Sequence, residues 1–198
     1  DLGFPAERVL LLRVDFREAG YEPARRHSQL DELTGQIQRL PGVRATSYSQ
    51  LGLFSGGDSS ATVEVEGHVP KGDSDRESGF DVVGPRYFST LGIPLRLGRD
   101  IVEEDRGDSP KVCVVNEAFV KRFFANRNPI GMRVTPLGYD AADRISYQVV
   151  GVAGDAHTGS LRGDVGPRYF VAAKQLADAV RSPTFLIRTV TDTAPVMA

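Results

Sequence analysis

The sequence predicts an α+β fold, with a β-α-β unit in its N-terminal part and a second group of short strands and helices after it. Several runs of β-branched and apolar residues are typical of strands, and the first is followed by a segment whose apolar residues recur at helical spacing. A turn-rich connection at 53–60, LFSGGDSS, indicates a subdomain boundary. The chain has 198 residues, of which 40% are hydrophobic, and this suits one domain or two closely associated subdomains with a proper core.

The N-terminal unit begins with a strand predicted over 8–16. Its middle, at 9–12, is wholly apolar, so we expect this strand to lie in the centre of a sheet. A helix follows and ends at Pro41, and a second strand at 43–49 completes a β-α-β unit with parallel strands. The apolar helix face, which we expect to pack on the sheet, consists of Ala24, Leu30, Leu33, Ile37 and Leu40. The polar face, which we expect to meet solvent, consists of Arg25, Arg26, Asp31, Glu32 and Gln36.

After the connection, the pattern changes from helical spacing to short extended pieces. Residues 61–67 alternate valine with glutamate, which predicts a strand with one wet face. Residues 70–78 are polar and predict a mobile loop, while 80–83 returns to an extended pattern. A short helix is predicted at 85–91, before the turn at Gly92.

The clearest succession of signals runs from Val112 to Val134. Val112 to Val115 form a continuous apolar run, which predicts a buried strand. Asn116 provides a helix N-cap and Glu117 places a carboxylate near the positive end of the helix dipole. The inward-facing side of this helix is predicted to consist of Phe119, Val120, Phe123 and Phe124, before Pro129 and Gly131 form a turn.

Three strands and one helical run are predicted near the C-terminal end. Strands are expected at 145–152, 168–172 and 184–189, with a short helical run at 174–180 between the last two. The pentapeptide GPRYF occurs twice, at 84–88 and 166–170. The residues that follow the two copies diverge, so we interpret the match as chance rather than as a repeat unit.

The stretch VVNEAFVKRFFANRNPIGMRV closely resembles the signature of the MacB-like periplasmic core domain of ABC transporter permeases of the MacB/FtsX type. The segments GFPAERVLLLRVDF, VVGPRYFSTLGIPLRLGRDIVEED, YQVVGVAGDAHTGSLRGD and FLIRTV resemble other parts of that domain in the same order. The resemblance implies a β-α-β porter-like subdomain at 1–57 plus 166–198, with a smaller mixed α/β subdomain inserted at 58–165. It also implies that the motif residues serve as a framework: Asn116, Glu117, Phe119, Phe124, Pro129, Ile130 and Gly131.

The resemblance further implies a non-catalytic domain on the periplasmic side, tethered to the inner membrane between two transmembrane helices of the permease. The implied partners are those helices, a separate ATP-binding subunit or domain, a second permease copy in a dimer, and a periplasmic partner protein. In such a permease the domain conveys ATP-driven motion to substrates or partner proteins. One departure is that the helix and strand expected after 184–189 are absent.

Composition limits the alternatives. The formal net charge is −2, with 24 basic and 26 acidic residues mixed along the chain, which argues against a charge-driven nucleic-acid partner. No run approaches the roughly 20 apolar residues that cross a bilayer. The resemblance therefore predicts a piece excised from between membrane helices, and a trimmed soluble protein is the alternative interpretation.

No catalytic residue, cofactor or metal site is predicted, because no Walker A loop, H-E-x-x-H motif, nucleophile elbow or paired Cys/His ligands occur. Cys113 is expected to be a buried small hydrophobe. Glu103, Glu104 and Asp105 are expected to form an exposed acidic helix end. Two other function classes stay open: a soluble protein that binds a small ligand, and a hydrolase that uses Asp155 and His157.

Overall fold

A computed structural model describes residues 2–16, 18, 20, 25–55, 59–138, 144–159, 163–176 and 180–190. The strands are β1 (Val9–Arg13), β2 (Val43–Ser49), β3 (Ser60–Val65), β4 (Glu77–Val83), β5 (Leu95–Gly98), β6 (Val112–Asn116), β7 (Arg133–Pro136), β8 (Tyr147–Ala153), β9 (Arg168–Ala172) and β10 (Thr184–Thr189). The α-helices are α1 (Arg26–Gln38), α2 (Tyr87–Leu91) and α3 (Glu117–Phe124), and short 3-10 helices span Asp73–Arg76 and Ala173–Gln175. Few helices and many strands confirm a mixed α and β fold.

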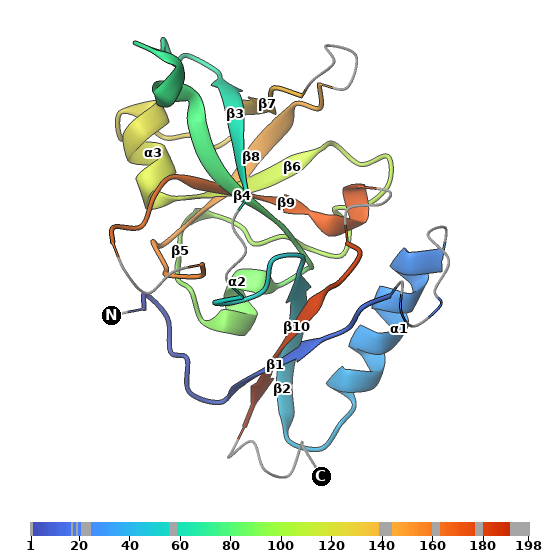
Figure 1. Cartoon of the computed structure of the whole chain (residues 1–198). Helices are drawn as coiled ribbons and strands as arrows, with labels where there is room; N and C mark the ends of the chain where they lie inside the picture. Colours follow the sequence, from blue (N-terminus) through green and yellow to red (C-terminus); the bar gives the residue numbers. More distant parts are fainter. Residues whose placement is uncertain are drawn as a thin grey trace.

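The strands β3, β4 and β6 to β9 form a ring that closes on itself (Figure 1). β4 pairs with β3, β3 with β7 and β7 with β8, all antiparallel. β8 then pairs with β6 in parallel, β6 with β9 in antiparallel, and β9 returns to β4 in parallel. We call these strands, β3, β4 and β6 to β9, the strand ring. β5 pairs with the second half of β8, along the edge where β7 pairs with the first half.

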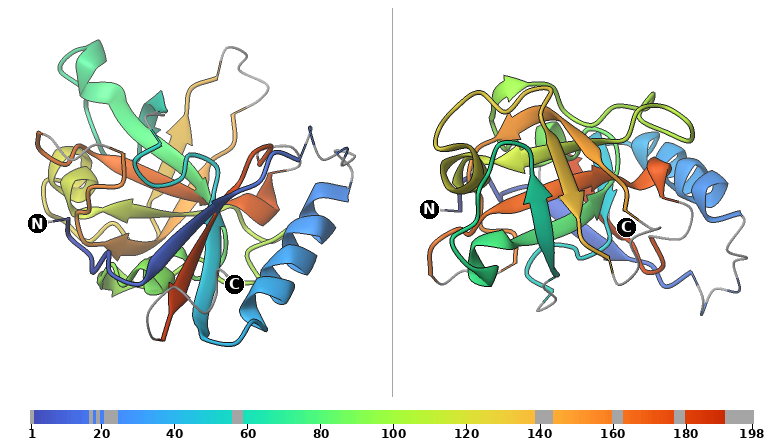
Figure 2. Two further views of the ribbon diagram at one scale, coloured as in Figure 1. Left: turned by 60° about the horizontal axis from the view of Figure 1, so that its bottom comes forward. Right: turned by 90° about the horizontal axis from the view of Figure 1, so that it is seen from above.

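The remaining strands form a three-stranded sheet in the order β1-β10-β2. β10 is antiparallel to both neighbours, so β1 and β2 run parallel to each other, as the sequence predicts, but with β10 between them. This sheet reaches the strand ring through β4, where Ser49 of β2 lies opposite Val83. Figure 2 shows α1 beside this sheet, on the opposite side of the molecule from α3. The predicted division of the chain at 57/58 and 165/166 stays a prediction.

The prediction that residues 9–12 lie in the centre of a sheet is wrong. Among the described strands, β1 pairs only with β10 and forms the end of the strand order. Leu11 and Leu12 are 47% and 46% exposed. An apolar run is expected of a strand covered on both faces, but here it occurs in an edge strand that is covered only in part.

Two hydrophobic cores lie on opposite sides of the strands. The first fills the strand ring with inward side chains such as Val63, Cys113 and Tyr169, and it extends to Leu30 and Ile37 of α1. The second packs α2 and the N-terminal segment against the outside of β6, β9 and β10. Cys113 is fully buried, which confirms the sequence interpretation.

Three surface predictions need correction. Arg26 is only 6% exposed at the first turn of α1, where the aliphatic part of an arginine can cover apolar surface. Asp105 is 5% exposed and lies in a turn, because its carboxylate receives two hydrogen bonds from the Arg99 guanidinium, at 2.7 and 2.8 Å. The predicted loop at 70–78 contains a 3-10 helix and the start of β4, with Ser78 buried.

No helix within the described residues is long and apolar enough to cross a membrane.

Candidate functional site

The junction of β6 and α3 is held together by the side chain of Asn116. Its Oδ1 accepts hydrogen bonds from the N–H groups of Phe119, at 3.0 Å, and Arg168, at 2.8 Å. Its Nδ2 donates to the carbonyl of Gly166 at 2.9 Å. The predicted N-cap is therefore confirmed, and the same amide also fixes the segment that enters β9.

The first turn of α3 exchanges hydrogen bonds with the segment after β8. The N–H of Ala118 donates to Asp155 Oδ1 at 2.9 Å, and the N–H of Asp155 donates to Glu117 Oε2 at 3.3 Å. Arg96 Nε lies 3.3 Å from the other Glu117 oxygen. Burial raises the pKa of Asp155, and the bond from Ala118 opposes that rise. The Asp155 carboxylate thus serves as a helix cap in this structure.

The aromatic side of α3 points into the core. Phe119, Phe123 and Phe124 are at most 2% exposed, as predicted. The rings of Phe119 and Phe123 lie 4.4 Å apart between centroids, and the ring of Tyr169 in β9 lies 6.4 Å from Phe119. The helix therefore joins the strand ring through packed aromatic side chains, with Tyr169 edge-on to Phe119.

The Pro-Ile-Gly turn attaches the chain after α3 to β8. Pro129 is buried, and its carbonyl accepts a 2.9 Å hydrogen bond from the N–H of Met132. The N–H of Gly131 donates to Val149 at 2.9 Å, from a backbone with φ of +88° that favours glycine. Ile130, in contrast, is 39% exposed. The framework role of these residues stays a prediction, and the Ile130 side chain contributes least to packing.

A second set of contacts joins the three-stranded sheet and α1 to the strand ring, and we call it the joint. Lys174 follows β9, and its Nζ lies 2.6 Å from Asp31 on α1 and 2.5 Å from Glu103. The Lys174 side chain is 10% exposed, whereas both carboxylates are more than half exposed. These ion pairs raise the pKa of Lys174 against the opposing effect of burial.

Arg188 of β10 is the second member of the joint. Its guanidinium donates to the carbonyls of Thr90 and Leu91, at 2.5 and 2.6 Å, and so caps the C-terminal end of α2. It also donates to the carbonyls of Pro5, at 2.9 Å, and Glu7, at 3.3 Å. One cation therefore binds β10 to α2 and to the N-terminal segment.

Asp81 of β4 is the third member of the joint. It is 4% exposed, and its Oδ1 accepts hydrogen bonds from the N–H groups of Val82, at 2.8 Å, and Leu51, at 3.1 Å. Burial raises the pKa of Asp81 to about 6, although these bonds and the charge of Arg168 oppose the rise. The carboxyl group holds the turn through which the chain leaves β2.

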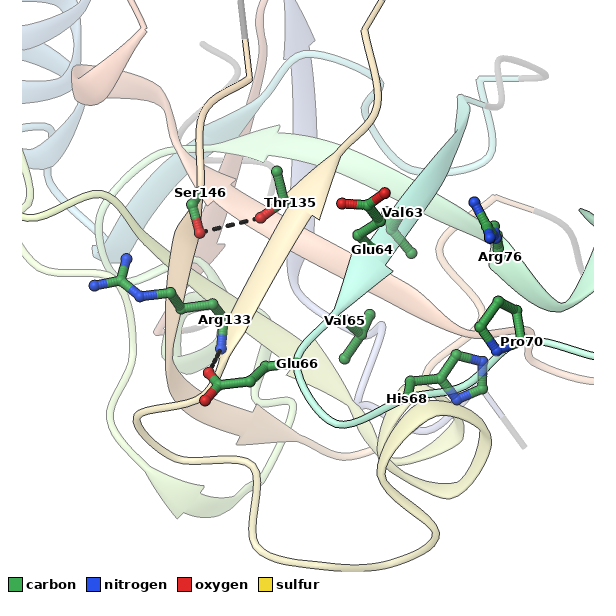
Figure 3. Close-up of a pocket in the computed structure, with 10 residues that line it drawn as sticks. All are labelled: Val63, Glu64, Val65, Glu66, His68, Pro70, Arg76, Arg133, Thr135 and Ser146. Atoms are coloured by element: carbon green, nitrogen blue, oxygen red, sulfur yellow. Dashed lines mark hydrogen bonds between the residues drawn. The ribbon is translucent and has the colours of Figure 1, made fainter. Parts of the chain in front are cut away.

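A hollow of about 480 Å³ lies beside β3 and β7 (Figure 3). The residues that line it are Val63, Glu64, Val65, Glu66, His68, Pro70, Arg76, Arg133, Thr135 and Ser146. Glu66 accepts a 3.1 Å hydrogen bond from the N–H of Arg133, and the hydroxyls of Thr135 and Ser146 lie 3.1 Å apart. Mixed charges and hydroxyls suit a polar ligand. Among the described residues, no group of His, Cys, Asp and Glu side chains is arranged to hold a metal ion.

The residues of the hydrolase alternative have structural contacts. Asp155 caps α3, and the N–H of His157 donates to the carbonyl of Leu2 at 2.9 Å. Thr158 is buried, and its carbonyl accepts a 2.9 Å hydrogen bond from Phe54. Ser160 lies outside the described residues.

Comparison with protein families decides the relationship. The model of the MacB-like periplasmic core domain matches residues 7–198. This chain belongs to that family.

Curated relatives of this MacB-like domain include two macrolide export ATP-binding/permease proteins named MacB. The protein from Aggregatibacter actinomycetemcomitans is 33% identical over 82 residues, which are 41% of this chain and 12% of that protein. The protein from Mannheimia succiniciproducens is 31% identical over 78 residues, which are 39% of this chain and 11% of that protein. The matched segments therefore make up about an eighth of the length of these relatives or less.

Solved structures share the fold of the MacB-like domain. The periplasmic region of MacB from Actinobacillus actinomycetemcomitans matches with a TM-score of 0.58 at 17% identity, over 97% of this chain and 79% of that one. The extracellular domain of the noncanonic ABC-type transporter YknZ from Gram-positive bacteria matches with a TM-score of 0.54 at 13% identity, over 82% of this chain and 73% of that one.

Sequence reasoning identified the α3 motif but not the joint. Asp81 and Arg188 each lie within a strand of mainly apolar residues. Only this position in a strand indicates that their side chains are at least partly buried. The sequence predicts that Lys174 begins a helical run, whereas the structure places it in the 3-10 helix that follows β9. Their partners are distant in sequence, so no local motif announces the contacts.

Proposed function

We propose that this MacB-like domain is the non-catalytic extracytoplasmic part of an ABC transporter permease, and that it transmits ATP-driven motion to substrates or partner proteins. The motion originates at a separate ATP-binding subunit or domain and reaches the domain through the transmembrane helices of the permease. The permease functions as a dimer on the inner membrane, and a periplasmic protein receives the motion. Membership of the family and the fold shared with MacB support this proposal.

The joint is the observation that carries the mechanical part of the proposal. A module that transmits force has to move as one body, so its two parts need links that resist bending. Here β4 pairs with both β2 and β9, and Lys174 and Arg188 add charged contacts between elements that are distant in sequence. Buried or partly buried polar contacts of this kind are directional and fix one geometry.

The entry and exit of the domain also suit insertion into a longer permease chain. The N–H of Thr189, at the end of β10, donates to the carbonyl of Arg8, just before β1, at 2.9 Å. Strands that enter and leave side by side are compatible with attachment to two neighbouring membrane helices.

The test uses the full-length permease, reconstituted in lipid with its ATP-binding subunit. Spin labels at Glu32 on α1 and Lys121 on α3, both exposed, report the internal distance, and labels at Lys121 in two copies report the distance between copies. We expect ATP to change the distance between copies and to leave the internal distance unchanged. In Lys174→Ala, we expect the internal distance distribution to broaden on ATP addition. An unchanged distance between copies, with ATP hydrolysis intact, would contradict transmission.

A second candidate function is the binding of a small polar ligand, which the hollow beside β3 and β7 favours. A ligand at about 100 times its Kd stabilises the folded state by about 2.7 kcal/mol through mass action. For a chain of this size, that raises the melting temperature by roughly 5–10 °C. A thermal-shift screen of polar metabolites, repeated with Arg133→Ala, tests this function. If no compound raises the melting temperature in a way that Arg133→Ala abolishes, the ligand-binding function is contradicted.

A further inference from the structure

Three strand ends meet at one corner of the molecule, drawn at the bottom of Figure 1. β1 and β2 begin there and β10 ends there. The N–H of Thr189 donates to the carbonyl of Arg8, and the N–H of Val190 donates to the carbonyl of Gly42, both at 2.9 Å. We call residues 8, 39–44 and 188–190 the strand-end corner.

Two large apolar side chains at this corner are exposed. Leu40, two residues after the end of α1, is 45% exposed, and Val190, just after β10, is 56% exposed. They lie on neighbouring segments, because Val190 is hydrogen-bonded to the turn that contains Leu40 and Gly42. Neither side chain belongs to either hydrophobic core.

Several arginines belong to the same corner. Arg8, Arg39 and Arg44 are exposed, and Arg8 donates to the carbonyl of Val190 at 3.3 Å. Burial lowers the pKa of Arg188, the nearby charge of Arg44 lowers it further, and the charge of Glu7 opposes this effect. Segments 2–10, 38–46 and 186–190 contain these four arginines and a single acidic residue, Glu7. The chain as a whole has a formal charge of −2, so the corner departs strongly from the average.

We propose that the strand-end corner docks on the surface of a lipid bilayer that contains anionic headgroups. Leu40 and Val190 enter the interfacial region, and the arginines pair with headgroup phosphates. Charge complementarity selects this partner, because apolar side chains and arginines at one corner match the acyl boundary and the phosphates together. A partner with phosphates alone leaves Leu40 and Val190 in water, and an apolar protein surface leaves the arginines unpaired. The inference concerns this surface only and stands independently of the motion proposed above.

The test is co-sedimentation of this chain with phosphatidylcholine vesicles, with and without about 30% phosphatidylglycerol, at low and at high salt. We expect binding to the anionic vesicles at low salt. Replacing the three exposed arginines together, as Arg8→Gln, Arg39→Gln and Arg44→Gln, is expected to lower the partition coefficient on the order of 100-fold, at about fivefold for each charge. Leu40→Ser with Val190→Ser is expected to lower it about tenfold.

Matched controls come from exposed residues elsewhere on the molecule. Leu97→Ser and Lys121→Gln remove an exposed leucine and an exposed cation outside the corner, and both are expected to bind like the parent chain. Circular dichroism and thermal melting confirm that each variant is folded. The proposal is overturned by equal binding to neutral and anionic vesicles, by a triple variant that binds like the parent, by an unaffected serine pair, or by a dimer that buries Leu40 and Val190 in solution.

Discussion

Lys174 Nζ lies 2.6 Å from Asp31 Oδ1, so a residue that follows a strand of the ring is paired with helix α1. The same ammonium group contacts Glu103 at 2.5 Å, and only 10% of the Lys174 side chain is exposed. Both carboxylates are more than half exposed, so solvent screening reduces the strength of each pair.

Removing this ammonium group should weaken the fold in a salt-dependent manner. Lys174→Ala is expected to lower the free energy of unfolding by about 1–2 kcal/mol at low ionic strength, and by less at high salt, because the carboxylates become screened. Urea denaturation at both salt concentrations measures this. Lys121→Ala, on the exposed side of α3, serves as the control and should change stability by less than about 0.5 kcal/mol. A loss for Lys174→Ala that is independent of salt would indicate a packing role instead.

Loss of the Asn116 side chain should be more costly. Asn116→Ala removes the cap of α3 and both bonds to the segment at 166–168, and leaves a buried N–H without its acceptor. We expect a loss of about 2–4 kcal/mol in urea denaturation. Asn116→Asp keeps the acceptor oxygen and should retain part of this stability. Asn128→Ala is the control, because Asn128 is exposed and accepts a single backbone hydrogen bond. Equal losses for Asn128→Ala and Asn116→Ala would refute the special role of Asn116.

Aromatic burial on α3 gives a third expectation. Phe119→Ala and Phe123→Ala should each cost roughly 3–5 kcal/mol, because both rings lie in the core and leave cavities when removed. Thermal and urea unfolding measure the loss. Val120, which is partly buried on the same helix, provides the comparison, since Val120→Ala should cost distinctly less. Near-neutral effects at both phenylalanines would mean that the helix presents another face.

The α3 region was predictable because its signals are local. An apolar run, an N-cap residue, helical spacing of phenylalanines and a Pro-Ile-Gly turn follow one another within 112–134, and the structure places β6, α3 and the turn there. Each signal reports backbone conformation through neighbours at most four residues away. The edge position of β1 could not be predicted, because an apolar run indicates that a strand is covered but not on which side or by which partner.

Closure of the strand ring could not be predicted, since it depends on pairings between distant segments. β4 pairs with β9 across about 90 residues, and nothing in either sequence specifies the other. The pentapeptide GPRYF shows the same limit. At 84–88, Arg86 adopts a left-handed conformation before α2, whereas Arg168 to Phe170 in the second copy form part of β9. Tertiary contacts therefore decide the conformation of these identical residues. They also decide burial, since the burial of Asp105 depends on Arg99.

The buried carboxyl of Asp81 predicts a dependence of stability on pH. Its folded-state pKa of about 6 lies above the ordinary value of 3.8, so the folded state binds the proton more tightly than the unfolded state. Its contribution to stability is therefore greatest below about pH 4 and is lost as the pH rises through about 6. Relative to Asp81→Asn, the parent chain should lose roughly 1–3 kcal/mol between pH 4 and pH 7. Urea denaturation of both proteins across this range gives the difference, in which other groups cancel. A difference that does not change with pH would show that Asp81 is ionised in the folded state throughout.

The edge position of β1 leads to the last prediction. Leu12 of β1 is 46% exposed, whereas Leu186 of β10, the strand between β1 and β2, is fully buried. Leu12→Ala should therefore cost less than about 1 kcal/mol, and Leu186→Ala should cost about 2–5 kcal/mol because it leaves a cavity in the core that contains α2. Urea denaturation midpoints with unchanged m-values measure both losses. Phe185 lies on the same strand as Leu186 and faces the first core. Phe185→Leu removes less side-chain volume than truncation to alanine, and checks that β10 tolerates a core substitution without unfolding. If Leu12→Ala and Leu186→Ala were equally destabilising, the Leu12 side chain would be packed against a neighbouring element, and the exposed position of β1 at the end of the β1-β10-β2 order would be wrong.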